Sequence, residues 1–415
     1  MKKINIGIIG LGNIGSALID VLRKNQAEIT KQSGVEIKVK KVCDIKKRPT
    51  PYYYSKDAFE LINDPSIDLI VEVIGGVQPA LKFILAALRA KKHVVTSNKE
   101  VIAKHLKEIL AMARKNKVQV MFEAAVGGGI PIIQPLREEL SGSGLTAVFG
   151  IVNGTTNYIL TKMSREGMEF SQALKQAQAK GYAEPDPTND IKGYDAAYKA
   201  AILAAVAFGI EVDWRAVHCE GITKISQEDI QYAAKIGYVI KLLAVARIID
   251  HKLDVRVHPA LVRNSHPLAG VSNNLNAIYV KGGAVGELMF EGQGAGGGPT
   301  ASALISDIVV LGRGKKLNQI QQKKIKIINP GEICDRYYLR LNVADRPGVL
   351  AKISKAFAGK KVSISTVVQL ETDGKDATLV ITVHETPGKN LLSALNIIKK
   401  LAVVKKVCNV IRIVS

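Results

Sequence analysis

Cysteine is scarce in this chain and gives no sign of a stabilising framework. Four cysteines occur among 415 residues and stand far apart, at Cys43, Cys219, Cys334 and Cys408. The sequence has no C-x-x-C pair and no metal-ligand spacing, which argues against a disulfide-rich secreted domain and a zinc site. We expect reduced, buried thiols in a cytoplasmic protein.

Aromatic residues are also scarce and make up only 5% of the chain. The net charge, in contrast, is strongly positive at +21. A basic chain can bind nucleic acid or attract a small anion. The lysines are scattered, with modest clusters such as Lys315-Lys316 and Lys405-Lys406, and no aromatic residues interleave with them. Solvated surface lysine is the simpler interpretation, so no nucleic-acid partner is expected.

Long apolar runs are also missing. The longest, Ala200 to Ile210, is too short to cross a bilayer, so no membrane association is expected. Ile4 to Ile9 follows Met1-Lys-Lys and could imitate a signal peptide, but it leads directly into a glycine-rich turn and is interpreted as a β-strand. The chain length, 47% apolar residues and 36 glycines suit an α/β protein of two or three domains.

Residues 1–122 alternate short apolar runs with helical patterns, which predicts a parallel sheet in a Rossmann-type dinucleotide-binding domain. The expected strands are Ile4–Ile9, Ile37–Val42, Leu69–Ile74, Val94–Thr96 and Val118–Phe122. After the first strand, Gly10 allows a tight turn, Gly12 a close approach of a pyrophosphate, and Gly15 close packing of the next helix. The amides that open this helix, at Asn13 and Ile14, would face the phosphates.

The residues after the second expected strand bear on the choice of cofactor. Asp44 suits the free 2′-hydroxyl of NAD, whereas Lys46 to Arg48 suit the 2′-phosphate of NADP. Both signals are present. We therefore expect NAD or NADP, with a slight lean to NADP.

The segment from Gly181 to Lys199 carries most of the chemical information. Four carboxylates crowd a loop with two prolines and the helix start after it, at Glu184, Asp186, Asp190 and Asp195. Asp195 and Lys199 are four residues apart in a helical pattern, so both leave the same face of the helix. A weak surface ion pair is one interpretation. The rigid acidic loop favours another, in which carboxylates hold an amino group while the lysine donates to an oxygen.

Residues 123–312 are expected to form an α/β substrate and dimerisation domain, followed by a polar, basic linker at 313–332. Strand-like pieces lie near Val148–Val152, Asp254–Leu261 and Ala277–Val280. The glycine-rich stretch from Glu291 to Ala301, which includes Gly297, could be a flexible linker. Because it leads into a helix, we favour a return of the chain to the cofactor.

Residues 333–415 show a βαββαβ pattern. Strands are expected at Tyr337–Val343, Ser363–Glu371, Ala377–Val383 and Val404–Ile413. One helix is expected to open at Asp345–Leu350 and run through about Gly359, and a second is expected at Leu391–Leu401. With Asp345-Arg-Pro-Gly348 at the first strand-to-helix turn, this region resembles an ACT domain, a ferredoxin-like module that usually binds an amino acid. A dimerisation module without a ligand is the alternative.

Together the three regions resemble a homoserine dehydrogenase with a C-terminal ACT domain, over nearly the whole chain. The resemblance implies NAD(P)-dependent interconversion of L-homoserine and L-aspartate 4-semialdehyde, in threonine, methionine and isoleucine biosynthesis. It also implies a homodimer or homotetramer, with threonine as a possible effector. Two other functions are disfavoured. A semialdehyde dehydrogenase would need an activated cysteine, and none of the four cysteines lies in a site-like loop. A non-catalytic amino-acid sensor would not need Lys99, Glu184, Asp195 and Lys199 together.

The resemblance assigns roles to residues of the acidic segment. It implies that Lys199 is the proton donor and that Asp195 orients the reacting end of the substrate. Glu184 would bind the substrate ammonium group, and Gly181 would lie where the loop meets the nicotinamide.

Thr96-Ser-Asn-Lys99 resembles the second lysine motif of the family. It follows an expected strand end, where α/β sheets place their sites, so Thr96 and Lys99 would contact the cofactor and Lys99 also the substrate. A surface lysine at a helix N-terminus is disfavoured because the helix dipole opposes a cation there.

The stretch from Glu123 to Ile130 resembles the monovalent-cation loop of the family. Na⁺ would suit the Glu123 carboxylate with the backbone carbonyls of Val126, Gly128 and Ile130. The glycines and the following proline could instead only turn the chain between domains.

Overall fold

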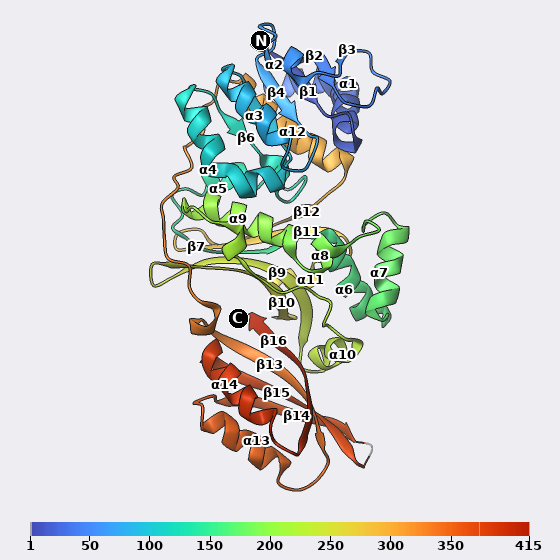
Figure 1. Ribbon diagram of the computed structural model, residues 1–415, viewed down its shortest axis with the longest axis vertical. Coiled ribbons are helices and arrows are strands. Elements are labelled where there is room, and N and C mark those ends of the chain that lie inside the picture. Colours follow the sequence, from blue (N-terminus) through green and yellow to red (C-terminus); the bar gives the residue numbers. More distant parts are fainter. Residues whose placement is uncertain (1, 373, 415) are drawn as a thin grey trace. The chain divides into compact units, whose positions relative to one another are not determined.

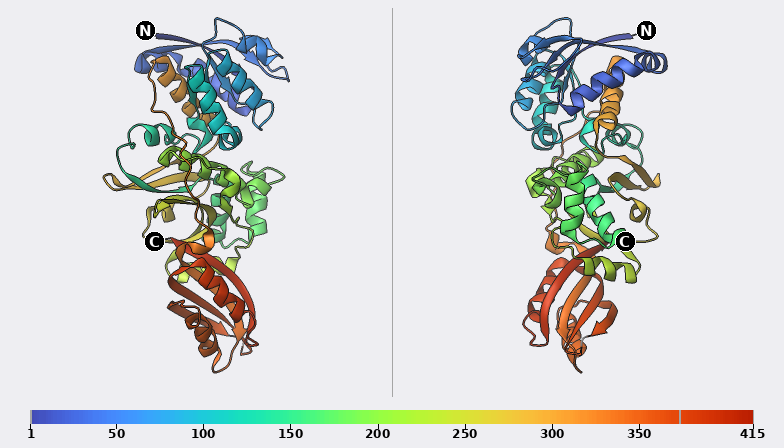
Figure 2. Two further views of the ribbon diagram at one scale, coloured as in Figure 1. Left: turned by 60° about the vertical axis from the view of Figure 1, so that its left-hand side comes forward. Right: turned by 90° about the vertical axis from the view of Figure 1, so that its right-hand side faces the viewer.

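The computed structural model describes residues 2–372 and 374–414. The chain divides into two compact units, each assembled from several segments (Figures 1 and 2). The first unit comprises Met1–Val152, Tyr198–Val217 and Leu275–Ile325, and the second comprises Asn153–Ala197, His218–Asn274 and Lys326–Ser415. The predicted domain limits are contiguous and do not anticipate this interleaving.

The first unit contains a six-stranded parallel sheet in the order β3-β2-β1-β4-β5-β6. This is the strand order of dinucleotide-binding folds, and it confirms the predicted fold class. The strands are β1 (Lys2–Ile9), β2 (Val35–Cys43), β3 (Tyr53–Ser55), β4 (Leu69–Glu72), β5 (His93–Thr96) and β6 (Val120–Met121).

Helices and short 3₁₀ turns connect these strands and extend the unit. They are α1 (Asn13–Ser33), α2 (Ala58–Ile62), α3 (Ala80–Arg89), α4 (Lys99–Lys115), η1 (Glu123–Ala125), α5 (Ile133–Arg137), η2 (Trp214–Ala216) and α12 (Gly297–Gly312). Three antiparallel strands complete the unit in the order β12-β11-β7, with β7 at Leu145–Ile151, β11 at Leu275–Gly282 and β12 at Gly286–Gln293.

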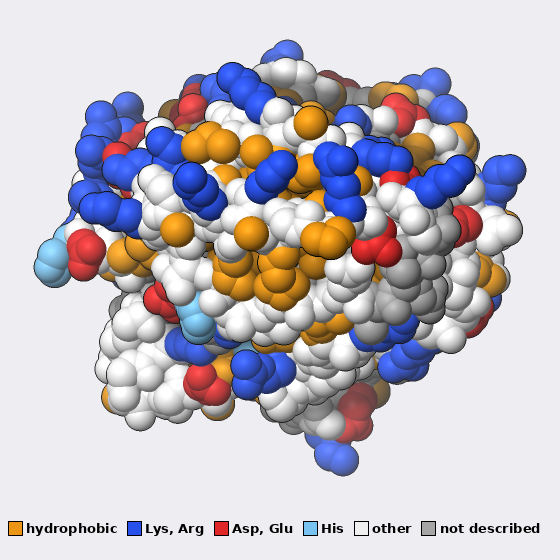
Figure 3. Space-filling view, turned by 90° about the horizontal axis from the view of Figure 1, so that it is seen from below, with side chains coloured by type: hydrophobic (Ala, Val, Ile, Leu, Met, Phe, Trp, Pro, Cys, Tyr) orange, Lys and Arg blue, Asp and Glu red, His pale blue; other side chains and the backbone are white. Residues whose placement is uncertain are grey.

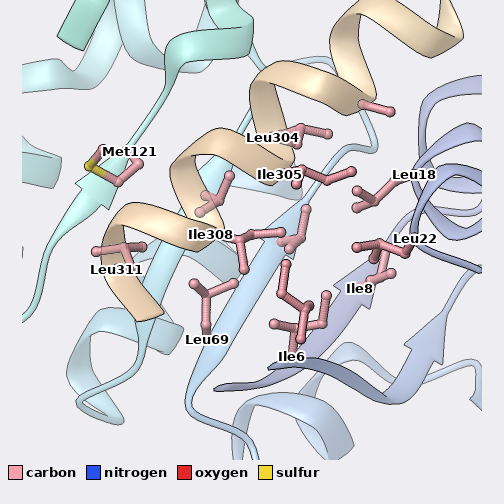
Figure 4. Packing of buried hydrophobic residues seen from close by; sticks show 14 of the residues in the cluster. Ile6, Ile8, Leu18, Leu22, Leu69, Met121, Leu304, Ile305, Ile308 and Leu311 are labelled. Carbon is pink, nitrogen blue, oxygen red and sulfur yellow. The ribbon is translucent and has the colours of Figure 1, made fainter. Parts of the chain in front are cut away.

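The hydrophobic core of this unit is closed by a helix from late in the sequence. Leu304 and Ile308 of α12 pack with Leu18 and Leu22 of α1 and with Ile6 of β1 (Figure 4). Each helix presents apolar residues at a spacing of four, which places them on one face. The glycine-rich stretch before α12 is therefore anchored to the dinucleotide-binding sheet.

The second unit contains a mixed sheet in the order β9-β10-β16-β13-β15-β14, with β8 paired to β10. Its strands are β8 (His218–Cys219), β9 (Tyr238–Ile249), β10 (Lys252–Arg263), β13 (Cys334–Ala344), β14 (Ile364–Thr372), β15 (Asp376–Pro387) and β16 (Val404–Val414). Its helices are α6 (Gly154–Glu166), α7 (Phe170–Ala179), α8 (Thr188–Ile191), α10 (Gln227–Lys235), α11 (Pro267–Gly270), η3 (Pro330–Glu332), α13 (Val349–Ala358) and α14 (Gly388–Ile398). Helix α9 (Tyr194–Phe208) begins in this unit and ends in the first.

The C-terminal module has the predicted βαββαβ order, and α13 and α14 pack on its antiparallel sheet around Phe357 and Leu395. Its last strand, β16, also pairs in parallel with β10, from Ala260↔Arg412 to Val262↔Val414. The module therefore shares one continuous sheet with the middle of the chain and is not held by the linker alone.

The part of the chain that the structure describes holds no helix with both the length and the apolar character that crossing a bilayer requires.

Candidate active site

The glycine turn after β1 has the geometry of a phosphate-binding loop. Gly10 has φ +109°, and its amide donates to the carbonyl oxygen of Cys43 at 2.8 Å. A Cβ on Gly15 would lie 1.9 Å from the carbonyl oxygen of Gly10, so only glycine lets α1 start this close. Gly12 faces open space and caps α1 without a side chain. The turn leaves room for a pyrophosphate at the amides of Asn13 and Ile14.

A cavity of about 430 Å³ lies beside this turn and is lined by Gly10, Gly12, Asp44, Gly75 and Gln78 among others. The Asp44 carboxylate accepts hydrogen bonds from the amides of Leu11 at 2.6 Å and Lys46 at 2.9 Å. Asp44 therefore braces the glycine turn as well as standing at the end of β2. These residues fit a nicotinamide dinucleotide.

The basic residues after β2 lie on the surface. Lys46, Lys47 and Arg48 are exposed, and Lys47 and Arg48 line a second hollow of about 670 Å³ together with Tyr52 and Tyr54. Exposed cations beside the end of β2 are placed where a 2′-phosphate would lie in this fold.

The structure brings the glycine stretch before α12 to the start of α1. A Cβ on Gly297 would lie 2.9 Å from the Cβ of Ala17, and a Cβ on Gly128 would lie 2.4 Å from the carbonyl carbon of Gly294. Gly297 is thus brought against α1, and the predicted cation loop meets the same stretch.

The motif after β5 is built around a buried carboxylate that the sequence analysis missed. Thr96 Oγ1 donates to Glu72 at 2.7 Å, and the amide of Asn98 donates to Thr96 Oγ1 at 2.9 Å. Burial raises the pKa of Glu72, and bonds from Thr96 and Ile74 oppose that rise. Lys99 is the first residue of α4 and is half-buried. The sequence did carry a signal for this residue, because Glu72 is a carboxylate at the end of the otherwise apolar strand β4.

Glu123 uses its carboxylate within the protein. The two oxygens accept from the amides of Ile132 at 2.5 Å, Ile133 at 2.7 Å and Gln134 at 2.8 Å, at the start of α5. Burial raises the pKa of Glu123, and these three bonds oppose it. Because the Glu123 carboxylate already accepts three backbone hydrogen bonds, a cation in this loop would be bound mainly by backbone carbonyls.

The acidic loop is fixed by the two helices before it. Gln178 of α7 donates to the backbone oxygens of Glu184 at 3.2 Å and Pro185 at 3.3 Å, and Thr155 of α6 donates to that of Tyr182 at 2.6 Å. These bonds hold the backbone, whereas the side chain of Glu184 is exposed. Gly181, with φ +73°, begins the turn into the loop.

Asp195 and Asp190 share a donor that the sequence analysis did not identify. Nδ2 of Asn153 lies 2.9 Å from Asp195 Oδ2 and 2.7 Å from Asp190 Oδ1. Its own Oδ1 accepts from the amide of Thr156, which makes Asn153 the N-cap of α6. In the sequence, Asn153 is only an asparagine that follows an apolar strand. Such a residue indicates the start of a helix and does not by itself indicate a functional site.

Lys199 and Asp195 are both buried, with exposed fractions of 8% and 5%. Lys199 Nζ donates to the carbonyl oxygen of Val152 at 2.7 Å. Val152 immediately precedes Asn153, so consecutive residues of the chain hold Lys199 and Asp195. Their burial rules out the alternative in which Asp195 and Lys199 form a weak ion pair on the solvated surface.

The described cysteines offer no activated nucleophile. All four are free, and burial raises the pKa of both Cys43 and Cys219 to about 11. Thiols with raised pKa values are poor nucleophiles, which disfavours chemistry through a thioester.

Three family models match the chain. Their descriptions are "Homoserine dehydrogenase, NAD binding domain" over residues 10–123, "Homoserine dehydrogenase" over residues 131–309, and "ACT domain" over residues 337–403. The homoserine dehydrogenase of Bacillus subtilis is 39% identical over 427 residues, with 100% of this chain and 99% of the other covered. That of Corynebacterium glutamicum is 40% identical, with 99% and 96% covered.

Solved structures give the same result. A homoserine dehydrogenase from Thiobacillus denitrificans matches with a TM-score of 0.95 at 39% identity, covering 100% of this chain and 99% of the other. A hyperthermophilic archaeal homoserine dehydrogenase in complex with NADPH matches with a TM-score of 0.66 at 29% identity, covering 76% and 99%.

Proposed function

The chain belongs to the homoserine dehydrogenase family, and on that premise we propose that Lys199 is the proton donor and Asp195 the carboxylate that orients the substrate. Its activity is that of an NAD(P)-dependent homoserine dehydrogenase in amino-acid biosynthesis. The observation that carries the proposal is the burial of both side chains on one helix, each held by one of two consecutive residues, Val152 and Asn153.

Lys199 exchanges a proton with the substrate oxygen that is a carbonyl in the aldehyde and a hydroxyl in homoserine. The nicotinamide supplies the hydride in reduction and takes it in oxidation. In aldehyde reduction, the ammonium of Lys199 stabilises the negative charge that grows on the oxygen and gives it a proton. In the reverse direction the neutral amine takes the proton of the homoserine hydroxyl. The Val152 carbonyl oxygen accepts a hydrogen bond from Nζ and holds it in place.

The acidic loop binds the amino-acid end of the substrate. Glu184 pairs with the substrate ammonium, and Asp195 accepts a hydrogen bond from the reacting end. The backbone bonds from Gln178 support this assignment because they fix the loop while the Glu184 carboxylate stays exposed. Gly181 and Gly297 border the nicotinamide half of the cofactor, and Lys99 contacts cofactor and substrate together.

The cofactor is NADP in preference to NAD. Three exposed cations, Lys46 to Arg48, stand beside the end of β2, whereas both oxygens of Asp44 already accept backbone hydrogen bonds. The archaeal homoserine dehydrogenase solved with NADPH supports the same preference.

A monovalent cation such as Na⁺ binds the loop from Glu123 to Ile130 through backbone carbonyls, including those of Val126, Gly128 and Ile130. The loop suits carbonyl ligation because Gly127 and Gly128 adopt φ of +76° and +57°, which bends the backbone sharply. The Glu123 carboxylate orders the loop from behind by capping α5.

The ACT module binds a small amino acid, most simply threonine, at the turn from Asp345 to Gly348. Gly348 has φ +85° and starts α13 without a side-chain cap, which suits a carboxylate at the helix amides. Binding between two copies makes the protein a homodimer or homotetramer. Exposed apolar residues of the module, Leu350, Leu392 and Ile397, support such an interface.

The surface of the molecule suits a protein partner better than a nucleic acid. One face of the molecule shows a band of hydrophobic side chains bordered by lysine and arginine (Figure 3). Basic side chains mixed with apolar ones suit contacts with another protein surface better than an aromatic-lined nucleic-acid groove. The four free thiols suit a reducing cytoplasm.

The experiment that tests the proposal is an assay of the full chain with L-homoserine and each nicotinamide, beside Lys199→Ala. Homoserine oxidation that prefers NADP⁺ and is lost in the variant is the expected result. Undiminished oxidation in Lys199→Ala would assign the proton transfer to another group.

A further inference from the structure

The short segment that joins the acidic loop to α9 is held from one side by residues 218–222. The amide of Ile222 donates to the carbonyl oxygen of Ile191 at 2.9 Å, and Cys219 Sγ donates to that of Lys192 at 3.2 Å. Burial raises the pKa of Cys219 to about 11, so the thiol keeps the proton it donates. The backbone between Asp190 and Asp195 is therefore positioned by this supporting segment.

The fit between the two segments is close. A Cβ on Gly221 would lie 2.0 Å from the carbonyl oxygen of Ile191, and one on Gly193 would lie 3.0 Å from Cys219 Sγ. Gly193 also has φ +87°. Contacts this tight transmit a displacement of the supporting segment to the segment that carries Asp195.

The supporting segment is in turn anchored to the sheet. His218 and Cys219 pair with Arg256 and Val257 of β10, and the amide of Glu220 donates to the Val257 carbonyl oxygen at 2.7 Å. The side chain of Glu220 points to a second partner. Its Oε1 lies 2.7 Å from Nη1 of Arg412 and 2.7 Å from Nε2 of His218.

Arg412 belongs to β16, the last strand of the ACT module, where it pairs with Ala260 of β10 and Tyr337 of β13. Its side chain is 15% exposed, and its Nε lies 3.7 Å from Oδ2 of Asp335. The side chain is thus fixed within the sheet. Glu220 stands between Cys219 and Gly221, which lie with Ile222 against residues 191–193, the segment that joins the acidic loop to α9.

We propose that Arg412, acting through Glu220, is a positioning residue for homoserine binding and the link by which the ACT module acts on the substrate segment. This rests on the proposed role of the acidic loop and Asp195 in holding the substrate. The Glu220 side chain is 42% exposed, so the pair adds little stability. Its effect is geometric, because it fixes Glu220 in the middle of the contacts that Cys219, Gly221 and Ile222 make with residues 191–193.

The test compares Arg412→Gln, Glu220→Gln and the double variant in the full-length enzyme. Each single change is expected to raise KM for homoserine by roughly tenfold, within the usual range of coupling between sites. The kcat should change less than about threefold, and the affinity for NADP should be unchanged. The double variant should resemble the worse single variant, because both changes break one contact.

Lys405→Gln is the matched control. Lys405 lies on the same strand and forms an ion pair with Asp376, away from residues 218–222. If Lys405→Gln raises KM as much, the effect is a general weakening of the module and the proposal is overturned. An unchanged KM in both Arg412→Gln and Glu220→Gln, or fully additive effects, overturns it as well.

A conservative variant keeps the test decisive if Arg412→Gln does not fold. Arg412→Lys keeps the positive charge that faces Glu220 and is expected to hold KM near that of the unaltered enzyme. A KM as high as that of Glu220→Gln contradicts the proposal. The assignment of the substrate site is checked separately with Glu184→Gln and Lys199→Ala. If those variants behave as expected and the Arg412 and Glu220 variants do not, the positioning role alone fails.

Discussion

Nζ of Lys199 donates to the carbonyl oxygen of Val152 at 2.7 Å, at the point where the chain leaves β7. The next residue, Asn153, donates to Asp195 one helical turn before Lys199. A single peptide unit therefore sets the positions of the proposed acid and of its neighbouring carboxylate. A backbone carbonyl therefore fixes Lys199, and a side chain that caps α6 fixes Asp195.

Lys199→Ala is expected to lower kcat for homoserine oxidation by about a hundredfold or more, because a positioned proton donor contributes on that scale. Affinity for NADP and the circular dichroism spectrum should be retained. Lys180→Ala, an exposed lysine just before the acidic loop, is the control and should turn over normally. Steady-state kinetics of both variants checks the assignment, and similar rates in the two would refute it.

Glu184→Gln is expected to raise KM for homoserine more than it lowers kcat. A carboxylate paired with the substrate ammonium contributes binding that is present in both the ground state and the transition state. Asp186→Asn is the comparison, because Asp186 bonds locally to Thr188. A collapsed kcat with an unchanged KM would make Glu184 a participant in the chemistry.

Lys46→Ala combined with Arg48→Ala is expected to weaken NADP binding more than NAD binding. Only NADP carries the 2′-phosphate that exposed cations at the end of β2 could meet. Lys24→Ala with Lys31→Ala, on exposed positions of α1, controls for net charge. Dissociation constants for both cofactors decide the matter, and equal weakening would make the cluster generic surface charge.

The sequence predicted those features that depend on local pattern. The glycine turn, the helix carrying Asp195 and Lys199, and the βαββαβ order of the C-terminal module follow from spacing and turn residues. Strand β9 (Tyr238–Ile249) was missed because its apolar run fits a buried helix as well as a strand. Strand β12 (Gly286–Gln293) was missed because its mostly exposed residues lack an apolar pattern.

Polar contacts between distant residues, in the site and elsewhere, could not be read from the sequence for a different reason. Asn153 and Asp195 are 42 positions apart, and Arg256 and Asp335 are 79 apart. Such pairs meet only after strands and helices have packed, and no local pattern records them. The pairing of β16 with β10 is of the same kind, because it joins residues about 150 positions apart that only the folded sheet brings together.

Asp335 is expected to make stability depend on acid pH. Burial raises its pKa, but a hydrogen bond from Arg256 and the charges of Arg256 and Arg247 outweigh this and lower the pKa to about 2. A lowered pKa stabilises the fold above the unfolded value of 3.8, and this contribution of about 2 kcal/mol is lost as the pH falls from about 4 to 2.

Asp335→Asn should therefore lower the thermal midpoint at pH 7, and the difference from the unaltered protein should shrink as the pH falls below 4. Asp213→Asn, which removes an exposed carboxylate near Arg215, should have little effect at either pH. Thermal unfolding followed by circular dichroism across this range provides the measurement. A pH-independent difference for Asp335→Asn would mean that lost packing, and not the charge, causes the destabilisation.

Threonine is expected to lower the rate of the full-length enzyme through the turn at Asp345, and Asp345→Ala should remove most of this response while leaving the basal rate unchanged. Typical coupling between effector and active sites changes affinity by about 5–150-fold. Deleting the module is a poor test, because it would strip β16 from β10 and remove Asp335 from the buried Arg256. The measurement is the homoserine KM with and without millimolar threonine, with Glu385→Ala, at an exposed position of the same module, as control. Inhibition that persists in Asp345→Ala would place the effector site elsewhere, and no response in the unaltered enzyme would leave the module as an oligomerisation device.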